Sequence, residues 1–155
     1  LEDIEVNTLR ANRGGDIDLN AFRTMGFIWE RVLTGQLIQA AEDCGSLVRP
    51  GELEKDGIYM TPDGLCPNEW VLEEWKCTWK SMRREIEDFW RYWAQIKSYC
   101  LALDCSHARL RVFFVNGDYK GSGPCFRVWE AEFTSRELQE NWDMILNHGK
   151  SMGVL

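Results

Sequence analysis

An uninterrupted stripe of apolar residues between positions 80 and 103 places the strongest constraint on the fold. The stripe comprises Met82, Ile86, Phe89, Trp93, Ile96, Cys100 and Leu103, separated by alternating steps of four and three. This spacing is typical of one face of an α-helix packed against a core. The sequence therefore predicts a long helix from Lys80 to about Leu103, with this face buried.

The stretch before this helix, residues 57–78, is predicted to form two strands joined by a turn at Pro67-Asn68. Glu74 and Lys76 are two residues apart on the second strand, so both side chains project from the same face. The residues around them are largely apolar: Val71, Leu72, Trp75 and Cys77. A carboxylate and an ammonium group on a partly enclosed strand suggest a chemical role.

Asp63 lies at the end of the first of these strands, before Gly64, and supplies a second carboxylate once the two strands pair. Two carboxylates can hold a hard divalent cation such as Mg²⁺, and a neighbouring lysine can orient or deprotonate a water molecule. That combination suits hydrolysis of a phosphodiester. On its own, the Pro-Asp-Gly sequence is also ordinary turn chemistry.

Pro62-Asp63 followed by Glu74-x-Lys76 resembles the signature of the PD-(D/E)xK nuclease superfamily. The surrounding words Thr-Pro-Asp-Gly and Glu-Trp-Lys-Cys-Thr resemble its phage lambda exonuclease-like and RecB-like branches. The resemblance implies an α/β (α+β) fold with a restriction-endonuclease-like core, in which helices flank a central mixed β-sheet. It also implies a single nuclease-like domain over residues 1–155, with the polar residues 1–18 as a candidate N-terminal arm.

The resemblance assigns roles to the residues of this motif. Asp63, Glu74 and the backbone carbonyl of Trp75 would hold Mg²⁺ or Mn²⁺. Lys76 would position the attacking water and stabilise charge on the phosphate.

Residues on two helices complete the implied site. Apolar residues at helical spacing predict a helix over residues 19–34, on which Glu30 would hold the metal through water and Arg23 would grip a phosphate. Glu30 on an exposed, ion-bearing helix face is the alternative. Gln95 and Tyr99, one turn apart on the long helix, resemble a further RecB-like motif and would shape the site or contact the DNA strand.

The remaining elements follow from periodicity and turn signals. A helix is predicted over residues 36–44, and a third strand of the initial meander near residues 47–53. Strands are expected at residues 109–115 and 126–133, separated by the Asn116-Gly117 turn. Thr134-x-x-Glu137 is a capping box that opens a final helix, for which Gly149 is the expected stop.

The six cysteines contain no Cys-x-x-Cys pair, and they are expected to be reduced thiols in a cytoplasmic protein, of the host cell if the chain is phage-encoded. The spacing of Cys100, Cys105 and Cys125 does not suggest an iron–sulfur cluster, and Cys105-Ser-His107 lacks a recognisable fourth zinc ligand. No apolar run approaches the roughly 18 residues of a membrane span, so no membrane partner is expected.

The formal net charge of −7 counts against DNA binding, because phosphate contacts usually leave a basic footprint. A metal-dependent nuclease, however, needs only a local basic groove. The expected function is a Mg²⁺- or Mn²⁺-dependent exonuclease acting on DNA ends in phage-type recombination or repair, with a homo-oligomer or a helper protein as further partners. Two alternatives stay open: a structure- or sequence-selective endonuclease of the same fold, and a non-catalytic protein-interaction module that retains it.

Overall fold

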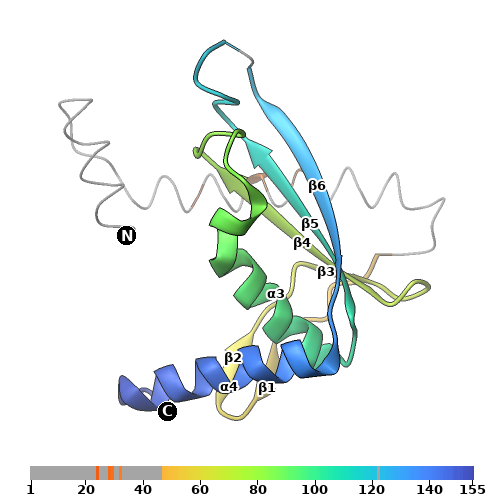
Figure 1. The fold of residues 1–155 in the computed structure, drawn as a ribbon. Helices are drawn as coiled ribbons and strands as arrows, with labels where there is room; N and C mark the ends of the chain where they lie inside the picture. The colour runs from red at the N-terminus through yellow and green to blue at the C-terminus, as the bar shows by residue number, and fades with distance from the viewer. Residues whose placement is uncertain (1–23, 25–27, 30–31, 33–46, 122) are drawn as a thin grey trace.

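The computed structural model describes residues 24, 28–29, 32, 47–121 and 123–155. Along this part of the chain the elements are β1 (Leu53–Lys55), β2 (Ile58–Met60), β3 (Gly64–Cys66), β4 (Val71–Thr78), the 3₁₀ helix η2 (Ile86–Phe89), α3 (Trp90–Leu103), β5 (His107–Phe114), β6 (Cys125–Glu132) and α4 (Ser135–Ser151) (Figure 1). Thr24, Ile28, Trp29 and Val32 are helical, as predicted for residues 19–34. The helix predicted over residues 36–44 lies outside the described residues.

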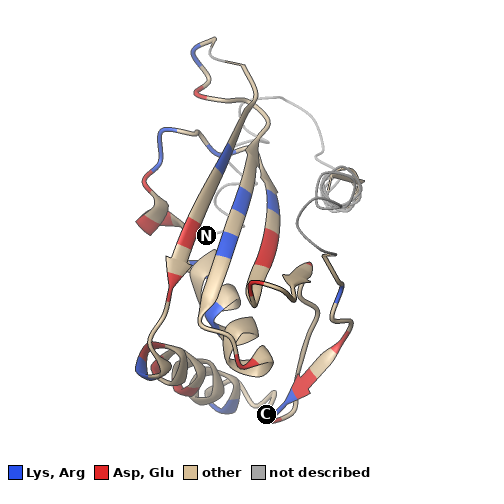
Figure 2. Cartoon of the chain, turned by 90° about the vertical axis from the view of Figure 1, so that its right-hand side faces the viewer, with Lys and Arg blue, Asp and Glu red and all other residues tan. Residues whose placement is uncertain are grey.

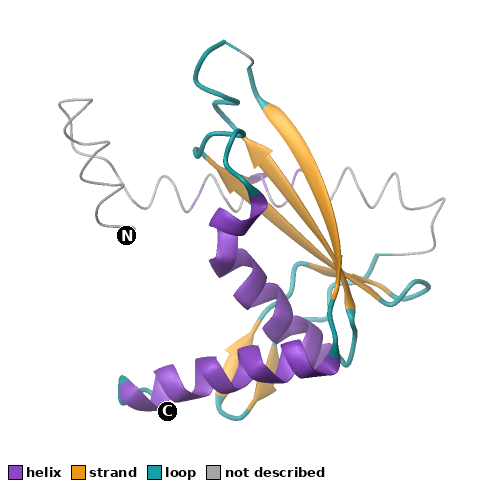
Figure 3. Ribbon diagram, in the orientation of Figure 1, coloured by secondary structure: helices purple, strands orange, loops and turns teal. Residues whose placement is uncertain are grey.

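A four-stranded mixed sheet forms the centre of the structure, in the order β3-β4-β5-β6. β3 and β4 are antiparallel, β4 and β5 are parallel, and β5 and β6 are antiparallel. The connection between the parallel strands contains α3, and both α3 and α4 lie on the same side of the sheet (Figure 3). A mixed sheet flanked by helices is the predicted fold class.

The main core lies between this sheet and the two helices. Alternate residues of the strands point toward α3, and Leu72, Leu110 and Val112 are fully buried there. Burying side chains of this size stabilises a fold by about 1.5–3 kcal/mol each. Ile96 of α3 and Trp142 of α4 close the core from the helical side.

α4 begins at the predicted capping box and is anchored across α3. The Thr134 side chain accepts from the Glu137 N–H, and the Glu137 side chain accepts from the Thr134 N–H. Asn141 donates from Nδ2 to the Ala94 carbonyl at 3.0 Å. The expected stop at Gly149 is wrong, because the helix continues to Ser151 and Gly149 is buried beside the terminal Leu155.

None of the helices in the described ranges has the length and apolar character needed to cross a membrane.

The long helix predicted from Lys80 begins ten residues later, at Trp90. Long-range contacts hold the preceding segment in a loop: the Met82 N–H donates to the Gly117 carbonyl at 2.8 Å, and Arg83 pairs with Asp118 at 2.8 Å. Met82 nevertheless packs against the core. The apolar stripe therefore identified buried residues correctly but placed the start of the helix too early.

The first strand of the predicted hairpin is divided between two sheets. β2 pairs with β1 in a separate two-stranded sheet, whereas β3 pairs with β4. Pro62 lies between β2 and β3 and has no N–H to donate to a ladder. The strand expected near residues 47–53 is accordingly represented by β1, outside the central sheet, and by an isolated bridge between Val48 and Leu65.

Candidate metal centre

Asp63, Glu74 and Lys76 lie together where β3 begins and β4 continues beyond it. Asp63 Oδ2 accepts a hydrogen bond from the Trp75 N–H at 2.8 Å. Lys76 Nζ donates to Glu74 Oε1 at 2.6 Å. The three residues of the predicted motif are thus neighbours, connected through the backbone and side chains of β4.

Close packing at Gly64 fixes the position of Asp63. Gly64 pairs with Glu73 at the start of the β3–β4 ladder. A Cβ atom at residue 64 would lie 2.9 Å from the Trp75 ring and 3.0 Å from the Leu47 side chain. Glycine therefore lets β3 approach β4 closely, and the preceding Asp63 side chain reaches the Trp75 backbone.

The two carboxyl groups are in an environment that disfavours their charged forms. Glu74 is 1% exposed, and its burial, together with the neighbouring Asp63, raises its pKa to about 7. Burial likewise raises the pKa of Asp63. Burial alone would lower the pKa of Lys76, but the charge of Glu74, the hydrogen bond to it and the charge of Asp63 together outweigh burial, and the pKa is raised. Lys76 is therefore charged at neutral pH.

One oxygen of this cluster has unmet hydrogen-bonding capacity. Within the described part of the chain, Glu74 Oε2 is a buried side-chain atom with no hydrogen-bond partner. Leaving such an oxygen unpaired is costly in a low-dielectric interior. An unpaired carboxylate oxygen beside a second carboxylate fits a cation that binds there.

The donor set suits a hard divalent ion. The Asp63 and Glu74 carboxyl groups are close enough for the charge of Asp63 to raise the pKa of Glu74. In an extended strand the N–H and C=O of one residue point to the same side, so the Trp75 carbonyl points toward Asp63 as its N–H does. Mg²⁺ takes oxygen ligands and keeps several of its waters, which fits two carboxylates and one carbonyl.

The same part of the chain contains no group of three or more His, Cys, Asp and Glu side chains arranged to hold a metal ion. The sequence assigned an additional carboxylate to Glu30 and a phosphate contact to Arg23. Both residues lie outside the described residues. Their neighbour Trp29 packs its ring against Phe113, with 4.4 Å between ring centroids.

Gln95 and Tyr99 of α3 form a hydrogen-bonded pair next to the carboxylates. Gln95 Nε2 donates to the Tyr99 hydroxyl at 2.6 Å. Burial raises the pKa of Tyr99, and the negative charges of Glu74 and Asp63 add to this increase. The tyrosine hydroxyl therefore lies within electrostatic reach of the carboxyl pair, on the side covered by α3.

Tyr92 is a neighbour of the site that the motif did not identify. Lys76 Nζ lies 5.8 Å from the centroid of the Tyr92 ring, a distance at which cation–π attraction operates. Tyr92 is seven residues before Tyr99, so the two lie on one line of the helix. That spacing is the sequence signal by which Tyr92 could have been found.

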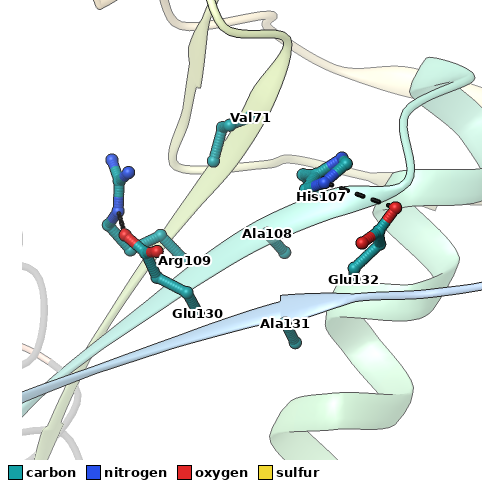
Figure 4. A pocket seen from close by; sticks show the side chains of 7 residues that line it. All are labelled: Val71, His107, Ala108, Arg109, Glu130, Ala131 and Glu132. Carbon is teal, nitrogen blue, oxygen red and sulfur yellow. Dashed lines mark hydrogen bonds and ion pairs between the residues drawn. The ribbon is translucent and has the colours of Figure 1, made fainter.

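The opposite face of the sheet carries a second, self-neutralised set of charges. Glu73 is buried and pairs with both Arg109 and Arg111. Figure 2 views this face and shows basic residues of β5 beside acidic residues of β4 and β6. A nearby hollow of about 280 Å³ contains the Arg109–Glu130 and His107–Glu132 pairs at 2.7 and 3.5 Å (Figure 4). Because these charges compensate one another, we assign them to holding the strands together.

The cysteines singled out in the sequence are not all near one another. Cys105 precedes β5, whereas Cys125 pairs with Phe114 at the far end of that strand. At 3.3 Å per residue, the length of β5 separates them by roughly 23 Å. Cys100, Cys105 and Cys125 therefore do not form one ligand set.

No protein-family model matches this chain, and no curated protein does. Among solved structures, the chain is similar to a phage-related exonuclease from Haemophilus somnus 129PT, with a TM-score of 0.50 and 13% identity over 72% of this chain and 63% of that one. It is also similar to the alkaline exonuclease LHK-Exo from Laribacter hongkongensis, with a TM-score of 0.54 and 15% identity over 88% of this chain and 72% of that one.

At such low identity the similarity concerns the fold. The chain shares its fold with these exonucleases, and the predicted fold class, a central mixed sheet flanked by helices, is confirmed. It spans less than two thirds of the length of the Haemophilus somnus exonuclease.

Proposed function

We propose that this chain is a divalent-metal-dependent deoxyribonuclease that acts on DNA ends. The observation that carries the proposal is the buried pair Asp63 and Glu74 beside Lys76, in which Glu74 Oε2 has no hydrogen-bond partner among the described residues. The chain shares its fold with two exonucleases, and this similarity supports the proposal.

In this proposal, Asp63, Glu74 and the Trp75 carbonyl hold Mg²⁺ or Mn²⁺. When bound, the ion lowers the pKa of a coordinated water and neutralises charge on the phosphate. Burial of the carboxylates in a low-dielectric site strengthens their attraction for a cation. Burial raises the pKa of Glu74 and the charge of Asp63 adds to the increase, so a bound cation would favour the charged forms of both carboxyl groups.

Lys76 has a separate task in the same mechanism. Glu74 Oε1 accepts one of its protons, and the Tyr92 ring lies beside the ammonium group. An ammonium group has three donors, so others are available for the attacking water or a phosphate oxygen. Lys76 thus orients the nucleophile and stabilises negative charge as the phosphorus–oxygen bond breaks.

The helical residues are assigned to positioning in this proposal. Tyr99, oriented by Gln95, limits the space beside the carboxyl pair and contacts the DNA strand. Glu30 holds the ion through water, and Arg23 binds a phosphate.

DNA is the proposed substrate, and the setting is phage-type recombination or repair in the cytoplasm of a host cell. A chain of 155 residues has little surface with which to enclose a duplex, so further copies or a helper protein are proposed as partners. Full activity of a monomer, checked by its elution volume during the assay, would remove the need for them.

Digestion of labelled DNA tests the function. Linear duplex, circular duplex and single strands are incubated with wild type, Asp63→Ala and Lys76→Ala in Mg²⁺ or Mn²⁺, with Arg136→Ala on the remote helix α4 as the matched control. We expect degradation of linear duplex by wild type and Arg136→Ala, and at least a ~100-fold loss in the two site variants. Nicking of circles would make the chain an endonuclease, and inactivity of folded wild type in every metal would favour a protein-interaction role.

A further inference from the structure

Two cysteines lie side by side where α3 ends and the chain turns toward β5. Cys100 lies in the last turn of α3, and Cys105 follows Asp104, which has a left-handed backbone with φ of 53°. The Cys105 N–H donates to the Cys100 carbonyl at 3.0 Å. The chain thus folds back on the helix, and the two thiol groups are close enough to affect each other's pKa.

The pair is enclosed but borders a hollow. Cys100 is 0% exposed and Cys105 is 4% exposed. Both line a hollow of about 470 Å³ together with Trp70, Asp104 and His107, a volume typical of small-molecule sites. Trp70 Nε1 donates to the Asp104 carbonyl at 3.0 Å and holds the turn in place.

We propose that Cys100 and Cys105 are a modification site, an oxidisable pair that forms a disulfide within the folded protein. A disulfide requires Cα atoms about 4.4–6.8 Å apart. The backbone hydrogen bond between the two residues holds them close together without any rearrangement of the strands. This property is independent of the proposed nuclease activity.

The environment distinguishes the two thiols. The neighbouring Cys100 thiol lowers the pKa of Cys105, whereas the Cys105 thiol and burial raise the pKa of Cys100. Because the thiolate is the reactive form, Cys105 is the attacking group and Cys100 the resolving one.

The oxidant is a small-molecule disulfide such as glutathione disulfide. The Cys105 thiolate attacks one sulfur, forming a mixed disulfide and releasing one glutathione. Cys100 then loses its proton and attacks the Cys105 sulfur, which releases the second glutathione. Two protein thiols are oxidised, one small disulfide is reduced to two thiols, and both protons pass to the released thiolates.

Mass spectrometry of native protein tests this proposal. Wild type is incubated with glutathione disulfide, the oxidant is removed, the protein is unfolded in excess alkylating agent so that buried free thiols react, and the cysteine-containing peptides are mapped. We expect a Cys100–Cys105 disulfide that dithiothreitol reverses, and the same result for Cys66→Ser, which changes a buried cysteine outside the pair. Alkylated, unlinked Cys100 and Cys105 in wild type would overturn the proposal.

A thermal melt gives a second readout. Closing the loop between residues 100 and 105 restricts the unfolded chain, so oxidation raises the melting temperature of wild type and of Cys66→Ser. Cys105→Ala shows no such increase. An equal increase in Cys105→Ala would also contradict the proposal, and the mapping of wild type decides the matter if this variant does not fold.

Discussion

Glu74 belongs to the candidate metal site and also affects the stability of the folded protein. Its side chain is buried, one oxygen pairs with Lys76, and the other has no hydrogen-bond partner among the described residues. Without a bound cation the charged form of this residue destabilises the folded state. In the absence of a metal ion, the free energy of unfolding should therefore decrease as the pH rises and Glu74 becomes charged.

The sign follows from the pKa of Glu74, about 7 in the folded chain against an ordinary value of 4.5. The folded state holds the proton more tightly, so its stability is greatest below pH 4.5, as far as this residue is concerned. It falls as the pH rises toward 7. A shift of this size corresponds to on the order of 3 kcal/mol. Urea unfolding in a chelator should give a lower free energy of unfolding at pH 8 than at pH 5.

Glu74→Gln removes the titrating group and should flatten this dependence, with Asp63 responsible for what remains. Glu140→Gln, an exposed change on α4, is the matched control and should leave the dependence as in wild type. An unchanged slope in Glu74→Gln would contradict the burial of a charged Glu74.

At the scale of secondary structure, local patterns predicted the elements whose contacts are themselves local. The capping box at Thr134 and the alternation of β5 both lie where the sequence placed them. The start of α3 was misplaced because Met82 bonds to Gly117, a partner 35 residues away that no local pattern reveals. The division of the predicted first strand into β2 and β3 likewise depends on pairing partners, because β2 pairs with β1 and β3 pairs with β4.

The same distinction applies to the candidate site: local spacing could be predicted from the sequence, but contacts between distant residues could not. The sequence placed Glu74 and Lys76 on one face because residues two apart on a strand must share a face. It could not show that Glu74 Oε2 is unpaired or that Tyr92 lies beside Lys76, since both facts depend on how α3 packs on the sheet. The sequence also did not indicate that Glu73 pairs with Arg109 and Arg111 on the opposite face of the sheet.

The close approach of β3 to β4 yields a prediction at this scale. In Gly64→Ala the added methyl group would lie against the Trp75 ring and Leu47, and overpacking of this kind costs about 1–3 kcal/mol. It should also displace Asp63. Chemical denaturation should show the loss of stability, together with weaker Mn²⁺ binding.

Gly149→Ala is the control for this substitution. It meets the side chain of the terminal Leu155, which can move, and alanine favours a helix over glycine by about 1 kcal/mol. We therefore expect unchanged or increased stability and normal Mn²⁺ binding. Equal stability of Gly64→Ala and wild type would show that β3 and β4 are not in close contact.

For the whole molecule, the net charge of −7 must be reconciled with DNA as the proposed substrate. A chain of aromatic contacts extends from the site to the loop after β4: Lys76 lies over Tyr92, Tyr92 stacks on Phe89, and Lys80 lies over Phe89. Lys76, which pairs with Glu74, and Lys80 thus lie at the two ends of one aromatic cluster, and we expect Lys80 to contact DNA there.

Lys80→Glu should weaken DNA binding several-fold, more at low salt than at high salt, because phosphate contacts release counterions. Fluorescence anisotropy in Ca²⁺, which allows binding to be measured apart from cleavage, gives the affinity. Arg136→Glu makes the same change of charge on α4, away from the site, and should have little effect. Equal losses in both variants would indicate a general effect of net charge.

Calorimetric titration with Mn²⁺ measures whether Asp63 and Glu74 hold a divalent cation, as proposed. We expect saturable binding to wild type that is lost in Asp63→Asn and Glu74→Gln and retained in Lys76→Ala. Binding that survives both carboxylate substitutions, or no binding to folded wild type, would contradict the proposal.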